Sequence, residues 1–311
     1  MSLPALFDMA LAALVLTVGL WVILARTAFA ATVGFVACGL LLTLAWFRLG
    51  APDVAMTEAA IGGGVTGALL IGAASRRSAG GEDRDRPGMP ARIVIAMLCA
   101  MVAAGIAAAV LALPDPAPTL APEAAAALPA TGVGNPVTAV LMAFRALDTL
   151  LEMAVLVLAL LAVWSLAPDG AWGGAPGTML PPAAEPLVFL ARLLPPVGIV
   201  VGMHLLWTGA DHPGGAFQGG TVLAAMWLLL WMAGLARVPA TRGRALRAVL
   251  IAGVVLFVVV GLGGIPLAGA FLALPPALAK PLILLVEAAK ILSVAAAMAL
   301  LVLGPPLREV R

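Results

Sequence analysis

The stretch PVTAVLMAFRALDTLLEMAVLVLALLAVWSL, residues 136–166, is apolar over the length of a membrane-spanning helix but carries three charged side chains. About 20 apolar residues are needed to cross the hydrocarbon core of a bilayer. Arg145, Asp148 and Glu152 each cost about 2.5–3.5 kcal/mol near mid-membrane on insertion scales, which nearly cancels the gain from the surrounding Leu and Val residues. The stretch therefore predicts a membrane helix whose polar side faces protein.

The composition of the whole chain is that of an integral membrane protein. Of its 311 residues, 63% are apolar and 10% are charged, and the mean hydropathy is +1.15. Soluble domains are nearer half apolar and a quarter charged. The net charge is only +2 and the basic residues are scattered, which excludes a nucleic-acid-binding surface. Cys38 and Cys99 lie in apolar segments and imply no disulfide framework.

The hydropathy pattern predicts an all-α, polytopic protein of the cell (plasma or inner) membrane with about nine transmembrane helices. The first apolar run is too long for a secretory signal and begins with Asp8 rather than with a basic residue. The expected spans are residues 3–25, 28–47, 52–74, 93–113, 136–166, 187–208, 220–236, 248–266 and 281–303.

The distribution of basic residues predicts the orientation. The Arg-rich loops 76–92 and 237–247 are expected on the cytoplasmic side, which places the N-terminus outside and the C-terminus inside. An odd number of spans is needed to keep most of the Lys and Arg residues on that side. The Ala/Pro-rich connection 114–134 is expected to be a semi-extended external linker without chemistry.

Arg145, Asp148 and Glu152 have the spacing i, i+3, i+7, which would place them within about 60° of one helical face. One guanidinium balances only one of the two carboxylates. The remaining carboxylate, in a medium of low dielectric constant, is a candidate to hold and release a proton near neutral pH. The alternative is a static ion pair that joins two helices.

A second polar segment is GAPDVAMTEAAIGGGVTGALL, residues 50–70. Asp53 is explained either as a carboxylate at a helix N-terminus or as part of an ion pathway. Glu58 has no basic neighbour in its own helix, and an unpaired intramembrane Glu indicates function. The dense glycines after it allow close helix packing or mark a bendable turn, and packing is the expected role. These glycines are Gly62, Gly63, Gly64 and Gly67.

The last span contains LVEAAKIL, in which Glu287 and Lys290 are neighbours at i, i+3. Lys280 lies one heptad earlier. A buried lysine shifts its pKa readily, so a carboxylate–lysine pair can pass a proton. A purely structural pair is the equal alternative.

A final polar cluster, HLLWTGADHPGGAFQGG, covers residues 204–220. Asp211, His212 and His204 suggest a metal site, but they lack familiar ligand spacing. A compact turn in which the side chains of His212 and Gln218 satisfy backbone groups is the better interpretation. Its expected residues are His212, Pro213, Gly214, Gly215, Gly219 and Gly220. No metal, cofactor or catalytic motif is expected anywhere in the chain, which argues against an enzyme.

Taken in order, three motifs resemble subunits of the Mrp-type (Mnh-type) multisubunit cation/proton antiporters and of membrane-bound hydrogenases. GAPDVAMTEAAIGGG resembles the hydrogenase-D-like part of the large antiporter subunit, NPVTAVLMAFRALDTLLE resembles the hydrogenase-E-like segment, and HPGGAFQGG resembles the glycine-rich turn of the B subunit. The resemblance implies a D-like domain at 1–92, an E-like segment at 93–180 and a B-like domain at 181–311.

The resemblance also implies a polar path for protons and monovalent cations such as Na⁺, formed together with other membrane subunits and without a cofactor. Asp53, Glu58, Arg145, Asp148 and Glu152 match the positions of that path, and Glu287 and Lys290 are added from their own pattern. The chain departs from the family at three places. These are Ala143 for an acid, Leu151 for a glycine and Ala216 for the third glycine of the turn.

Three other functions compete with an antiporter subunit. A membrane subunit of a redox-driven, hydrogenase-like pump would have the same architecture, and the chain has no iron–sulfur cysteine pattern with which to separate the two. A non-conducting structural connector and a self-contained transporter are the others.

Overall fold

The computed structural model describes residues 2–79, 88–177 and 183–306, and helices account for nearly all of them. In these ranges the β-structure is limited to one isolated bridge between Pro176 and Pro306. The all-α, multi-pass membrane fold expected from the hydropathy pattern is therefore confirmed. Nothing in the arrangement of helices reports which side of the membrane each end occupies, so the orientation stays a prediction.

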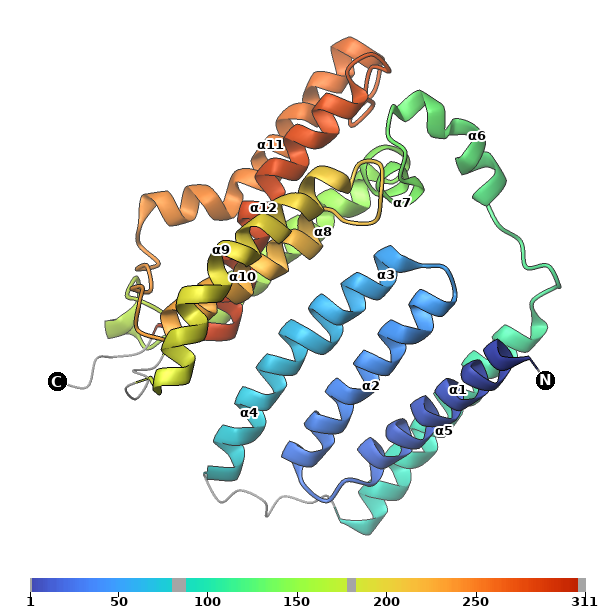
Figure 1. Cartoon of the computed structure of the whole chain (residues 1–311), viewed down its shortest axis with the longest axis vertical. Coiled ribbons are helices and arrows are strands. Elements are labelled where there is room, and N and C mark those ends of the chain that lie inside the picture. The colour runs from blue at the N-terminus through green and yellow to red at the C-terminus, as the bar shows by residue number, and fades with distance from the viewer. Residues whose placement is uncertain (1, 80–87, 178–182, 307–311) are drawn as a thin grey trace.

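The first part of the chain is a row of helices (Figure 1). α1 packs on α2, and α2 packs on a third span that is α-helical at both ends and a π-helix in its middle. α5 follows and has no buried residue. The bounds are α1 Leu3–Leu24, α2 Ala28–Arg48, α3 Pro52–Thr57, η1 Glu58–Thr66, α4 Gly67–Ala79 and α5 Met89–Ala112.

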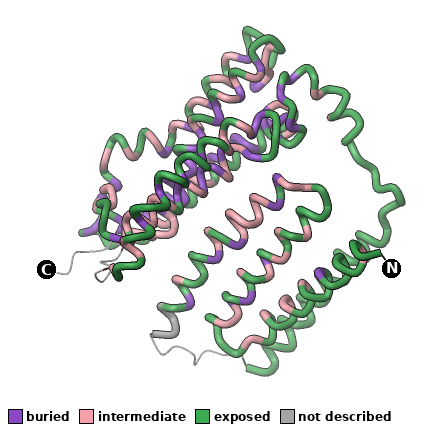
Figure 2. Tube along the Cα trace, viewed as in Figure 1, coloured by how far each residue is buried: buried purple, intermediate pink, exposed green. Residues whose placement is uncertain are grey.

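The second part is a bundle around α12, which contacts α8, α9, α10 and α11. In its most apolar window, 67% of the residues of α12 are buried, far more than in any other span of the described chain. Figure 2 shows this burial concentrated inside the bundle. The bounds are α8 Ala146–Ser165, η3 Asp169–Ala171, α9 Glu185–Thr208, α10 Ala216–Met232, α11 Arg244–Ala268 and α12 Ala279–Leu303.

Small residues allow these helices to approach closely, as is usual in membranes. A Cβ atom added to Gly219 of α10 would lie 2.6 Å from the carbonyl oxygen of Gly202 in α9. One added to Gly220 would lie 2.7 Å from Val294 of α12. Gly219 and Gly220 therefore belong to the helix crossings of α10, and their predicted place in the turn before it is wrong.

Eight described helices are long and apolar enough to cross a membrane. The helix α6 (Ala121–Thr131) and the helical segment Pro136–Phe144 would make a ninth if this bent pair counts as one span. α10, expected as a full span at 220–236, has 17 residues, at the lower limit for crossing. The expectation of about nine membrane helices agrees with this range. The division of the chain at 92 and 180 into three domains stays a prediction.

The span expected at 136–166 is broken. α7 (Pro136–Ala139) continues as the π-helix η2 (Val140–Phe144), and Arg145 then leaves the helical region with φ −129° and ψ 37° before α8 begins. The Thr149 hydroxyl donates to the carbonyl oxygen of Leu141 at 2.6 Å across the break. Such a side chain supplies a hydrogen bond to a backbone group that the break would otherwise leave unpaired in a membrane.

The connection 114–134 was also predicted wrongly in part, because it contains the helix α6 (Ala121–Thr131). Its alanines are strong helix formers. Pro122 suits the first turn, and Gly132 ends the helix in a left-handed conformation with φ 68°. Low complexity was therefore a poor guide here, since the composition within 121–131 favours a helix.

Candidate functional site

The turn between α9 and α10, residues 209–215, is the centre of the polar structure. Gly214 and Gly215 have φ values of 156° and 128°, which favour glycine. The Gly215 N–H bonds to the carbonyl oxygen of Leu205, and a Cβ on Gly209 would lie 2.6 Å from the Gly215 nitrogen. The turn is therefore compact, and its remaining backbone groups need partners from other segments.

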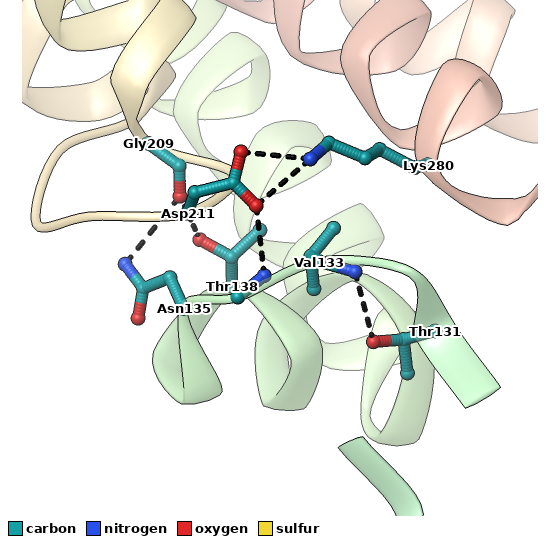
Figure 3. Close-up of polar contacts among 8 residues, drawn as sticks. Thr131, Val133, Asn135, Thr138, Gly209, Asp211 and Lys280 are labelled. Atoms are coloured by element: carbon teal, nitrogen blue, oxygen red, sulfur yellow. Dashed lines mark hydrogen bonds and ion pairs between the residues drawn. The ribbon is translucent and has the colours of Figure 1, made fainter. Parts of the chain in front are cut away.

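Two side chains next to or within α7 bind the carbonyl oxygens of the turn (Figure 3). The buried Asn135 amide donates to His212 O at 3.0 Å and lies 3.4 Å from Gly209 O. The Thr138 hydroxyl donates to Gly209 O at 2.5 Å. Asn135 Oδ1 accepts the N–H of Val137, so the same side chain caps α7 and fixes the turn.

Two carboxylates from opposite parts of the chain bind N–H groups at the end of the turn and at the first residue of α10. Gly214 N donates to Asp53 Oδ1 at 3.0 Å, and Ala216 N donates to Glu287 Oε2 at 2.7 Å. Asp53 is buried and also lies 3.4 Å from the Asn135 amide. It occupies the first turn of α3, as expected, but its hydrogen bonds join the first helices to the bundle. Backbone N–H groups at a helix start favour such anions.

Glu287 and Lys290 form a buried ion pair. Lys290 Nζ lies 2.5 Å from Glu287 Oε1, and the two side chains are 3% and 10% exposed for Lys290 and Glu287 respectively. Lys290 Nζ also lies 5.4 Å from the centre of the Phe217 ring and 3.5 Å from Met142 Sδ. The ammonium is thus held by a carboxylate, an aromatic face and a thioether, which suits a charge removed from water.

A cavity of about 320 Å³ lies against this pair and the turn. Three carboxylates and one ammonium line it, and it lies between the first helices and the bundle. Glu152 is the third carboxylate, and it has no hydrogen bond or ion pair with another described residue. The charged lining residues are Asp53, Glu152, Glu287 and Lys290, and the neutral polar ones are Thr57, Thr138, Thr149 and Gln218.

Arg145 and Asp148 do not line the cavity. Their ion pair is exposed, with the Arg145 side chain 69% and the Asp148 side chain 51% accessible. The prediction that Arg145, Asp148 and Glu152 share one helical face assumed a continuous helix. The helix breaks at Arg145, so that prediction is wrong for this residue. Asp148 and Glu152 remain one turn apart on α8.

Glu58 also lies outside the cavity lining. Cβ atoms added to Gly62 and Gly39 would be 2.4 and 3.2 Å from its carboxylate oxygen Oε1, so the side chain lies against η1 and α2. A Cβ on Gly67 would be 2.6 Å from Val36 of α2. The glycine-rich segment therefore does serve close packing, and it also forms a π-helix.

The side-chain roles predicted in the turn need correction. Gln218 donates to the hydroxyl of Thr57 at 3.0 Å rather than to the backbone, and His212 contributes its carbonyl oxygen to the bond with Asn135. The backbone groups are satisfied instead by Asn135, Thr138 and the two carboxylates. In the described ranges, no three His, Cys, Asp or Glu side chains are grouped as metal ligands.

An ion pair closes the outer surface of the turn (Figure 3). Lys280 Nζ lies 2.7 and 2.8 Å from the two carboxylate oxygens of Asp211, and Gly134 N donates to Asp211 Oδ1 at 3.0 Å. The hydrogen bond from Lys280 holds the pKa of Asp211 below its usual value. Asp211 thus ties the start of α12 and the segment before α7 to the turn.

Asn135, Thr138 and Thr57 were not selected from the sequence as site residues. The pair Asn135–Pro136 is a recognisable helix start, since Asn is a preferred N-cap and Pro suits the first position. That signal locates α7. It does not reveal that the free amide N–H groups of Asn135 face a turn 74 residues later.

Two family profiles match separate parts of the chain. The MbhD profile, which describes the D subunit of MBH, matches residues 13–79, and the profile described as a domain related to the MnhB subunit of Na⁺/H⁺ antiporter matches residues 186–305. One region of the chain is thus similar to MbhD and another to the MnhB-related domain. This combination confirms the resemblance to Mrp-type antiporter subunits and to membrane-bound hydrogenases. The chain is a multi-pass membrane protein.

Two solved structures share this fold. The Mrp complex from Dietzia sp. DQ12-45-1b contains a chain that is 23% identical, with a TM-score of 0.72; the match covers 97% of the present chain and 35% of the Mrp chain. The membrane-bound sulfane sulfur reductase (MBS), an archaeal respiratory membrane complex, contains a chain that is 22% identical, with a TM-score of 0.55; this match covers 70% of the present chain and 99% of the reductase chain. The present chain thus spans about a third of the length of the Mrp chain. A search of curated proteins gave no match.

Proposed function

We propose that the chain is a membrane subunit of a multisubunit monovalent cation (Na⁺)/proton antiporter and contributes part of its ion pathway. It acts as a transport subunit rather than as an enzyme, and it depends on other membrane subunits for a complete path. Support comes from the MnhB-related domain and from the fold shared with a chain of the Mrp complex. The N-terminus is proposed to lie outside and the C-terminus inside.

The single observation that carries the proposal is the cavity between the two parts of the chain. Three carboxylates meet one ammonium there, in a volume large enough for several water molecules. Ionisable groups are expensive in a membrane and usually mark ion or proton paths. A lining that holds more carboxylates than cations favours uptake of a proton or a monovalent cation.

The lining residues have different parts in this mechanism. Asp53 and Glu287 are fixed by the N–H groups of Gly214 and Ala216, and Lys290 neutralises the charge of Glu287. Glu152 has no such partner among the described residues and is free to exchange a proton or to coordinate a cation. Glu58 and the pair Arg145–Asp148 lie outside the cavity, and we assign them to continuations of the path toward partner subunits.

Glu152→Gln tests the proposal. The substitution preserves size and removes the exchangeable charge, and no described hydrogen bond is lost. The complex should assemble normally while cation/proton exchange in everted membrane vesicles falls by at least about tenfold, the change that corresponds to 1.4 kcal/mol in a barrier. Glu123→Gln in α6, outside the cavity, is the matched control and should leave exchange unchanged.

A redox-driven complex is the second candidate, favoured by the MbhD match and by the fold shared with the sulfane sulfur reductase chain. The proteins that copurify after gentle solubilisation distinguish the two. Soluble iron–sulfur subunits would indicate the redox assembly, whereas membrane subunits alone would indicate the antiporter.

A non-conducting structural connector is the remaining alternative. Normal cation/proton exchange in the variants Glu152→Gln, Asp53→Asn and Glu287→Gln would leave only this role.

A further inference from the structure

An apolar groove opens between α1 and α2, on the opposite side of the first helices from the cavity. Its volume is about 390 Å³. Leu11, Ala12 and Leu16 of α1 face Leu42 and Ala45 of α2 across it. Figure 1 shows α1 beyond α2 at the edge of the molecule away from the bundle. The proposed ion pathway makes no use of this groove.

The groove is open at one end of the helix pair and closed toward the other. Its lining on α1 runs from Asp8 to Leu16, a rise of about 12 Å along the helix. Further along, a Cβ on Gly34 would lie 2.4 Å from the ring of Trp21, so α1 and α2 are in direct contact there. The groove therefore covers less than half of the roughly 30 Å hydrocarbon core. A membrane-crossing partner helix would need a longer groove, whereas one acyl chain of a single leaflet fits.

An ion pair without net charge, Arg48–Asp8, lies at the end of the groove away from Trp21. Arg48 donates from Nε and Nη2 to the two carboxylate oxygens of Asp8 at 2.8 and 3.0 Å. The side chains of Arg48 and Asp8 are 42% and 52% exposed, and the guanidinium carbon lies 5.7 Å from the centre of the Phe7 ring. Two of the five guanidinium N–H groups are used in this pair, and each carboxylate oxygen keeps a further lone pair.

The charges and the groove together define a complementary ligand. The free N–H groups of Arg48 match a phosphate, and the free lone pairs of Asp8 match an ammonium that can donate hydrogen bonds. Arg48 is the last residue of α2 and Asp8 lies near the start of α1, so the pair lies at one end of both helices. Charged side chains near the ends of membrane helices reach the level of the lipid headgroups. An anionic lipid would satisfy Arg48 but would place a second negative charge beside Asp8.

We propose that this groove binds one acyl chain of a zwitterionic phospholipid with a primary ammonium, whose phosphate contacts Arg48 and whose ammonium contacts Asp8. The lipid would cover the face of α1 and α2 that points away from the bundle. The site is independent of ion transport, so a failure of the proposed antiport function does not affect it.

The occupant is identified by photo-crosslinking in native membranes. A benzoylphenylalanine placed at Leu16, an exposed residue at the rim of the groove, should give a covalent lipid adduct, which mass spectrometry identifies as phosphatidylethanolamine. The same probe at Ala13, which is exposed and outside the groove, should give a mixture that reflects the bulk membrane. A polypeptide adduct at Leu16 would overturn the proposal in favour of a partner helix.

Binding is measured with the purified chain by native mass spectrometry, with phosphatidylethanolamine and phosphatidylglycerol added in turn. Ala12→Phe fills the groove and should lower phosphatidylethanolamine affinity by about tenfold, since losing contact with two methylene groups has that effect. Ala13→Phe should leave it unchanged. Asp8→Asn should remove the preference over phosphatidylglycerol. Equal binding by the two Phe variants, or an unchanged preference in Asp8→Asn, would refute the site.

Discussion

Two ion pairs of this chain have the same spacing, i and i+3, and nearly the same geometry, but opposite surroundings. Arg145–Asp148 and Glu287–Lys290 each have an N–O distance of 2.5 Å. The first pair is more than half exposed at the start of α8, whereas the second is almost fully buried on α12. Sequence spacing therefore determines that the partners meet, and it does not determine what surrounds them.

The difference follows from the positions of the two helices. α12 is central in the bundle, so a pair on it is enclosed by α8, α10 and the turn. Glu287 then binds the first N–H of α10 as well as Lys290. Arg145 lies at a helix break on the outside of the bundle, where the described part of the chain supplies its side chain with no partner besides Asp148. The buried pair is tied to the fold, and the exposed pair is available to a neighbouring subunit.

The largest expected effect comes from Lys290→Met. It leaves the Glu287 carboxylate buried without its cation, and breaking a buried pair in this way costs about 3–5 kcal/mol. Denaturant unfolding of the purified chain in mild detergent measures the loss. Asp148→Asn at the exposed pair is the matched control and should cost less than about 1 kcal/mol. Equal losses in the two variants would contradict the distinction drawn between the pairs.

The double variant Glu287→Leu, Lys290→Met sharpens the same comparison. Replacing both members of a buried pair by apolar residues is often neutral for stability. Relative to Lys290→Met, we expect most of the lost stability to return. Cation/proton exchange should nevertheless be absent in the double variant, because the cavity no longer contains this ion pair. Restored exchange would show that the pair is only structural.

A second prediction concerns the packing that keeps the pair buried. A Cβ added to Gly253 of α11 would lie 2.9 Å from Met153 Cε and 3.2 Å from Lys290 Cα, whereas one added to Gly263 meets nothing within 4 Å. Gly253→Ala should therefore cost about 1–3 kcal/mol through overpacking. Gly263→Ala in the same helix should be neutral or stabilising by up to about 1 kcal/mol. The same unfolding measurement checks both variants.

A third prediction concerns Asn135. Asn135→Ala leaves Gly209 O and His212 O without the amide donor and should cost about 1–3 kcal/mol. Hydrogen exchange in residues 209–215 should rise because the turn loses its attachment to α7. Val137→Ala, at an exposed position two residues later, is the control. Unchanged exchange in the turn would show that Thr138 alone is sufficient to hold it.

The smallest expected effect is a pH dependence from Asp211. Lys280 lowers the pKa of Asp211 in the folded state, so the pair stabilises the fold above the unfolded pKa of about 3.9 and the contribution is lost as pH falls through the folded pKa. Both side chains are largely exposed, so solvent screening keeps the contribution below about 1 kcal/mol. The difference in thermal stability between wild type and Asp211→Asn should be constant between pH 7 and pH 5 and should shrink progressively as the pH is lowered below about 4. A difference that does not shrink below that pH would contradict the assignment.

The sequence predicted which charged residues belong to the site, but it did not predict that they meet at one cavity. Asp53, Glu152, Glu287 and Lys290 are conspicuous because charges are rare in apolar segments. Their meeting at one cavity depends on the turn, whose N–H groups bind two of them from helices that are far apart in the sequence. The spacing of residues along a helix predicts only which side chains are neighbours on that helix. It cannot predict a contact between two segments that are far apart in the sequence.

The break at Arg145 was missed for a related reason. Residues 136–166 are uniformly apolar apart from their charges, and hydropathy measures length and polarity rather than helix continuity. The π-helix η2 and the bond from Thr149 to Leu141 O show how the break is accommodated. The helix in 121–131 was missed because composition suggested a linker, although alanine favours helix.

The sequence alone determined that the chain is helical and crosses a membrane several times, because apolar length and the cost of unpaired backbone groups in lipid leave no other structure for it. It also determined which ionisable residues are unusual and that Glu287 and Lys290 can pair. The tertiary structure decided which pairs are buried, which carboxylates share the cavity and where a helix ends early. The reason is that burial depends on contacts between segments distant in the chain, and these contacts are fixed only when the helices pack.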